Sequence, residues 1–167
     1  MTTVETATQV ETSDPLETLE LMARRADAEA QRIDESELHV GVTTAWREVS
    51  LWFAWRMEAQ VLQLGAPLEM RVPEDREAEV LRLLSIVNER LWLGHFDLWE
   101  GRKGFVYRHA VVLPEGQGVD ESQGEILLRA VTDAIDRFYP AFNYVIWGNK
   151  TAEEALDAAV FETVGTA

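Results

Sequence analysis

The sequence has no cysteine among its 167 residues, so it can form neither a disulfide framework nor a thiolate metal site. Basic residues are also scarce: 15 Lys and Arg stand against 30 Asp and Glu, which gives a net charge of −15. A chain of this charge repels phosphate backbones, so we expect no nucleic-acid binding. A basic protein partner, or high solubility alone, fits the charge better.

Long apolar runs are missing as well. No stretch approaches the ~20 residues needed to span a bilayer, and the acidic, Thr-rich N-terminus has no apolar segment typical of a signal peptide. We therefore expect a cytoplasmic protein without membrane insertion. The sequence also has no GxSxG motif, and the basic segment Gly101–Gly104 lacks the spacing of a phosphate-binding loop, which favours a hairpin turn.

The apolar residues that are present, 47% of the chain, are enough for a folded domain. Residues 1–13 are rich in Thr and Glu without an apolar period, which predicts a disordered tail. Residues 14–167 predict a single domain, long enough to bury a core.

Hydrophobic periodicity divides this domain into helices and strands. A first helix is predicted from the capping pair Asp14–Pro15 through Ile33, and a central helix from Pro73 until Gly94 stops it. Strands are predicted over residues 38–42, 45–55, 62–72, 95–99 and 105–113, and two last helices over 120–147 and 151–164. The order α-β-β-β-α-β-β-α-α with short connections predicts an α+β fold, an antiparallel five-stranded sheet packed with helices.

Three long segments of the chain resemble the YbjN family of bacterial sensory-transduction regulators. They are MRVPEDREAEVLRLLSIVNERLWLGHFDLW (70–99), DRFYPAFNYVIWGNKTAEEALDAAVFETVG (136–165) and SLWFAWR (50–56). The resemblance implies a fold like that of the type III secretion chaperones, often as a dimer. It implies no catalytic or ligand-binding residues, because the family has none that are settled. Asn149 stands where a second glycine is expected, and Asn tolerates the left-handed conformation.

Strand alternation separates two faces of the predicted sheet. Leu51, Phe53, Leu62, Leu64, Phe96 and Leu98 should face the helices. The opposite face then carries Trp46, Trp52, Gln63, His95, Asp97 and Trp99. Because a water-facing sheet surface is normally polar, its three tryptophans indicate either a surface for a partner or a second subunit, or a cover formed by the third or last helix.

One group of side chains could form a metal or catalytic site. His95 and Asp97 share a strand face, and the following hairpin could bring His109 close to them. A metal site needs about three such ligands that converge. A hydrogen-bonded histidine on an apolar face is the simpler interpretation of His109, because Phe105 and Tyr107 share its alternation.

Three hypotheses of function follow from these patterns. The first is a non-enzymatic regulatory or chaperone-like protein that binds a protein partner, needs no cofactor or metal, and forms a homodimer. The second is a small metal-dependent hydrolase that uses His95, Asp97 and His109. The third is a purely structural dimer within a larger assembly. An enzyme requires a pocket with converging polar groups, whereas a binding protein requires an exposed apolar patch or groove.

Overall fold

The structure is a computed structural model that describes residues 14–99 and 104–164. The tail predicted over residues 1–13 lies outside the described residues, as do residues 101–103 of the turn predicted at Gly101–Gly104. None of the helices in the described part has both the length and the apolar character that a membrane span requires.

The described strands form one antiparallel sheet in the order β1-β2-β3-β4-β6-β5. Their bounds are β1 (Ala30–Arg32), β2 (Glu37–Thr43), β3 (Glu48–Arg56), β4 (Val61–Leu68), β5 (His95–Trp99) and β6 (Gly104–Val112). The predicted α+β class with an antiparallel sheet is confirmed. The sheet has six strands rather than the five that were predicted, because β1 was not recognised as a strand.

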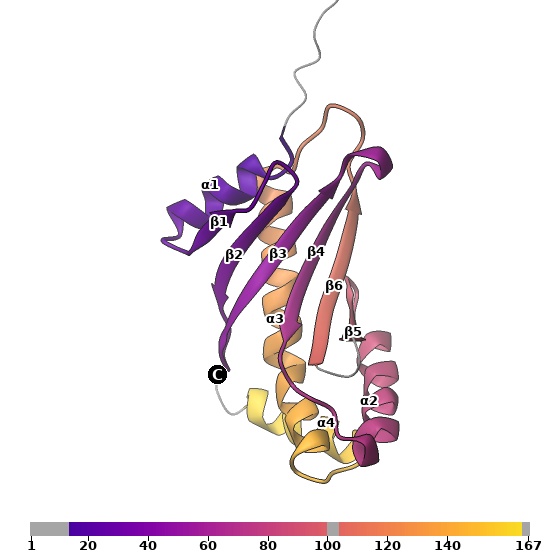
Figure 1. The fold of residues 1–167 in the computed structure, drawn as a ribbon. Helices are drawn as coiled ribbons and strands as arrows, with labels where there is room; N and C mark the ends of the chain where they lie inside the picture. The colour runs from indigo at the N-terminus through magenta and orange to yellow at the C-terminus, as the bar shows by residue number, and fades with distance from the viewer. Residues whose placement is uncertain (1–13, 100–103, 165–167) are drawn as a thin grey trace, which may run out of the picture.

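Four α-helices pack on one face of this sheet (Figure 1). They are α1 (Glu17–Arg25), α2 (Glu77–Glu89), α3 (Glu121–Ile146) and α4 (Ala152–Val164), with short 3-10 turns η1 (Met57–Ala59) and η2 (Glu74–Arg76). The longest helix, α3, runs behind the sheet and contacts the other three helices. Buried residues of all four helices join those of the sheet in one hydrophobic cluster.

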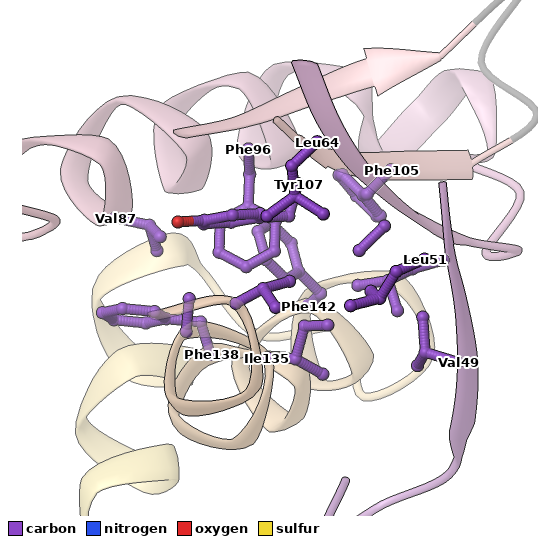
Figure 2. Packing of buried hydrophobic residues seen from close by; sticks show 14 of the residues in the cluster. Val49, Leu51, Leu64, Val87, Phe96, Phe105, Tyr107, Ile135, Phe138 and Phe142 are labelled. Atoms are coloured by element: carbon purple, nitrogen blue, oxygen red, sulfur yellow. The ribbon is translucent and has the colours of Figure 1, made fainter. Parts of the chain in front are cut away.

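Aromatic rings fill the centre of this cluster (Figure 2). Phe96 of β5 packs edge-on against Phe142 of α3, with 5.3 Å between the ring centroids, and against Tyr107 of β6, at 5.5 Å. The Tyr107 hydroxyl donates to the Leu93 carbonyl over 2.8 Å, and burial raises the pKa of Tyr107 to about 12. The residues predicted to face the helices are buried, apart from Leu98, which is partly buried against the same cluster.

The prediction that the first helix continues to Ile33 is wrong. The helix α1 ends at Arg25, and Asp27 adopts a left-handed conformation with φ 55° that turns the chain back. The Ala28 amide then donates to the Ala23 carbonyl over 2.9 Å, as in a helix C-terminal cap. The spacing of small alanines fitted a helix, but Ala30 pairs with Val40 of β2 instead.

A proline within α3 leaves a backbone carbonyl free to bind the turn between β2 and β3. Because Pro140 has no N–H, it cannot bond the carbonyl of Asp136, four residues earlier. The Trp46 indole Nε1 donates to this carbonyl over 2.9 Å, and the Ala45 amide donates to the Asp136 carboxylate over 2.7 Å. Trp46 therefore lies beside α3 and not on the face opposite the helices, because β3 and its alternation begin only at Glu48.

An arginine fastens the other end of α3. Arg76 donates through Nε to the Val145 carbonyl over 2.7 Å and through Nη1 to the Asn149 side chain over 3.1 Å. Its Nη2 donates to the Lys150 carbonyl. Asn149 has φ 51°, as expected from its position after the helix. One guanidinium thus binds the last turn of α3 and the loop to α4.

Side chains bind the backbone groups at the free edge of β5. The Asn88 side chain of α2 donates to the Phe96 carbonyl over 2.9 Å and accepts from the Phe96 amide over 2.8 Å. The Leu98 amide donates to the Asp97 carboxylate over 2.8 Å. Exposed edge strands readily pair with another chain, and these contacts occupy the backbone groups that such pairing would use.

Candidate functional site

The face of the sheet opposite the helices, called the outer face here, is defined by the pairing of neighbouring strands. Directly paired residues of antiparallel strands project to the same side. One row crosses the whole sheet through Gln31, His39, Trp52, Gly65, Arg108 and His95. A second row contains Glu37, Ala54, Gln63 and Ala110. Within the described residues no helix covers these rows, so the alternative in which the third or last helix does so is excluded there.

Trp52 lies directly on Gly65 at the centre of the outer face. A Cβ atom built on Gly65 would lie only 2.1 Å from the indole atoms Cε2 and Cζ2 of Trp52. Because Gly65 has no side chain, the half-buried indole of Trp52 can pack directly against the backbone of β4. Gly65 was not among the residues predicted for this surface, although a glycine within an alternating strand indicates a close approach of another group.

Hollows flank Trp52 on both sides. The first, of about 290 Å³, lies over β1 to β3 and contains Glu29, Gln31, His39, Glu48 and Ser50 among its lining residues. Its His39 contacts the Glu37 carboxylate over 2.6 Å. The second, of about 510 Å³, is lined by Trp52, Gln63, Leu64, Gly94, His95, Arg108, His109 and Ala110. The lining of this second hollow includes no carboxylate, in a chain with a net charge of −15.

The structure brings together only some of the residues predicted for the functional surface. Trp52, Gln63 and His95 line the second hollow. Asp97 is exposed on the same face of β5, opposite Val106, and Trp99 ends the strand opposite Gly104 with 44% of its surface exposed. Trp46 is separate from them, as described above. Arg108, which was not among the predicted residues, faces His95 directly.

The residues of the metal hypothesis do not share one face. His95 pairs with Arg108, whereas the next residue, His109, pairs with Leu64 and so has the alternation of the helix side, although both Leu64 and His109 contribute to the lining of the second hollow. The described residues include no group of three His, Asp or Glu side chains that could hold a metal ion. Burial, and to a lesser degree the nearby His95, lower the pKa of the His109 imidazole below its usual range.

A second exposed apolar site lies in the loop between α2 and β5. Trp92 is 99% exposed, and the neighbouring Leu93 is 40% exposed. This loop and α3 enclose a hollow of about 220 Å³. The predicted central helix, which was to continue until Gly94, includes Trp92, whereas α2 ends at Glu89 and leaves Trp92 in the loop.

Comparison with protein families shows that residues 15–143 match the YbjN model, described as "Putative bacterial sensory transduction regulator". The chain belongs to the YbjN family. The matched segment of this YbjN protein includes all residues of the outer face, whereas α4 follows it. A search of the curated proteins found no significant match.

Solved structures share the fold of this YbjN protein. The crystal structure of the ExsC-ExsE complex contains a chain that is 18% identical, with a TM-score of 0.54, and the match covers 77% of this chain and 92% of that chain. The crystal structure of YbjN from E. coli is 14% identical, with a TM-score of 0.50, and the match covers 88% and 93%. The predicted likeness to the type III secretion chaperone fold is thus confirmed at the level of architecture.

Proposed function

We propose that this YbjN-family protein is a non-enzymatic regulator that acts by binding a protein partner on the outer face of its sheet. The observation that carries the proposal is the position of Trp52, which rests on Gly65 at the centre of a face that no described helix covers. An antiparallel sheet can leave one face to water, but that face is normally polar. Tryptophan is enriched among the residues that dominate binding energy at protein interfaces.

Fold and charge give the proposal further support. The ExsC chain, which has a similar fold, was crystallised in a complex with ExsE, so this architecture can serve protein binding. The net charge of −15 favours a partner whose surface is basic overall, because opposite potentials speed association. Binding should therefore weaken as the salt concentration rises.

The homodimer predicted from the family resemblance remains part of the proposal. The fully exposed Trp92 with its neighbour Leu93 supports a contact between two copies, because a solvated tryptophan of this exposure is typical of an interface residue. This contact would leave the outer face open for the partner. Light scattering of the purified protein should give the mass of a dimer, and Trp92→Ser should reduce that mass.

The test of partner binding is affinity capture from the native host with a matched pair of variants. Trp52→Glu should leave the protein folded and abolish capture of the partner. Trp147→Glu changes an exposed tryptophan after α3, away from the outer face, and should leave capture unchanged. If Trp52→Glu unfolds the isolated protein, Trp52 is a core residue and the proposal fails. It fails equally if both variants capture the same proteins as the natural sequence.

A further inference from the structure

We infer that the hollow lined by Trp52, Gln63, His95, Arg108 and His109 binds a carboxylate group that the protein partner supplies. This inference rests on the proposed function, because it names the chemistry of one contact on the outer face. It assigns to a strongly acidic protein one small site that accepts an acid.

The local balance of charge supports this inference. Several cations of the surface meet acids of the same chain, as in the ion pairs of Arg24 with Glu20, Arg32 with Asp14 and Arg82 with Glu153. In the described part of the chain, the Arg108 side chain forms neither an ion pair nor a hydrogen bond, and its hollow is lined by two histidines and no carboxylate. On the same face of β5, two residues beyond His95, the Asp97 carboxylate accepts the Leu98 amide.

Hydrogen-bond donors also surround the hollow. The Arg108 guanidinium carries five N–H donors in a planar fork that matches a carboxylate, and His95 pairs directly with Arg108 across the strands. The Gln63 amide and the Trp52 indole add donors from β4 and β3. Donors from four strands therefore border this hollow, and a ligand with two acceptor oxygens could accept hydrogen bonds from them.

The His109 imidazole gives further support. Burial, and to a lesser degree the nearby His95, disfavour the charged form of His109 and lower its pKa. A bound carboxylate would act in the opposite direction and favour the charged form. The other groups facing the hollow are Arg108, which is always charged, and the uncharged Trp52, Gln63 and Ala110. Carboxylate binding should therefore take up protons and strengthen as the pH falls below the ~6.5 of a free imidazole.

The charge of the whole chain indicates which kind of molecule supplies the carboxylate. A polyanion such as a nucleic acid would meet the repulsion of the whole chain, with its net charge of −15. A single acid within an otherwise neutral or basic segment avoids this repulsion. The apolar indole of Trp52 beside Arg108 further suits a protein segment, in which an apolar side chain accompanies the acid.

The test follows the histidine signals by NMR during titration with the amide of N-acetyl-aspartate, with the amide of N-acetyl-asparagine as the uncharged control. The chain has three histidines, so His→Gln variants assign each signal. We expect His95 and His109 to shift with the acid probe alone. His39, on the far side of Trp52 and already paired with Glu37, should not shift. Binding should be several-fold tighter at about pH 5.5 than at about pH 7.5.

Arg108→Gln should weaken binding of the acid probe by roughly tenfold or more, because it removes the charge-assisted hydrogen bonds. The control is Arg56→Gln, which changes an exposed arginine at the end of β3 and should leave binding of the acid probe unchanged. Equal shifts of all three histidines, or unchanged binding in Arg108→Gln, would refute the site. Tighter binding of inorganic phosphate than of the carboxylate would refute the assigned ligand.

The outcome also separates this site from the proposed function. If Trp52→Glu abolishes partner capture while Arg108→Gln changes neither capture nor probe binding, the outer face binds the partner and the carboxylate site is wrong. If the probe binds as expected but Trp52→Glu leaves capture unchanged, the site stands as an anion site and the proposed partner surface fails.

Discussion

The closure of β5 by Asn88 gives a prediction that can be worked out in magnitude. Asn88→Ala removes two hydrogen bonds to the backbone of Phe96, a residue that is only 2% exposed. Each backbone group left without a partner costs about 1–3 kcal/mol when water cannot fully replace the bond. We therefore expect the free energy of unfolding to fall by about 2–4 kcal/mol. For a chain of this length that lowers the melting temperature by roughly 5–15 °C.

The same variant should also change association, because the freed N–H and C=O groups form an open sheet edge. Urea unfolding followed by circular dichroism measures the stability, and light scattering measures the mass. Ser85→Ala, an exposed change one turn earlier on α2, is the matched control and should stay within about 0.5 kcal/mol of the natural protein. A loss below about 0.5 kcal/mol in Asn88→Ala, with unchanged mass, would show that the side chain does not protect the edge.

Three further predictions concern other contacts. Arg76→Lys should lower stability by about 1–3 kcal/mol in urea unfolding, since one ammonium cannot span three acceptors, while the exposed Arg71→Lys should have no effect. Gly65→Ala should displace the Trp52 ring, measured as a shift of its indole NMR signal, and an unchanged signal would contradict the contact. Because the pKa of Tyr107 is raised to about 12, its stabilising effect is complete below the unfolded value of ~10 and is lost as the pH rises through about 12. Tyr107→Phe should remove this alkaline loss in pH-dependent urea titrations.

Local signals in the sequence predicted much of the fold. Asp120 caps α3 through the Gln123 amide, and Thr151 and Glu154 form the reciprocal bonds of a capping box. Gly94 and Asn149 have the positive φ angles expected of residues after helices, at 68° and 51°. In each case the chemistry that ends or starts a helix lies within a few residues of the chain.

Features that depend on distant partners could not be predicted in the same way. The strand β1 has three residues and is defined only by its pairing with β2. The partner of His95 depends on the register of a hairpin, and a shift of one residue exchanges Arg108 for His109. The predicted site therefore grouped His95 with His109 and did not include Arg108, the residue that pairs with His95.

The contact between Trp46 and α3 has a consequence for how the sequence can change over evolution. Because Pro140 leaves the Asp136 carbonyl without its helical donor, the indole supplies the hydrogen bond that this carbonyl would otherwise lack. In a relative with another residue at position 140, the helix itself supplies a donor to this carbonyl, and the indole hydrogen bond contributes less to stability. Positions 46 and 140, which are distant in the chain, should therefore be replaced together among YbjN proteins, with tryptophan retained where proline is retained.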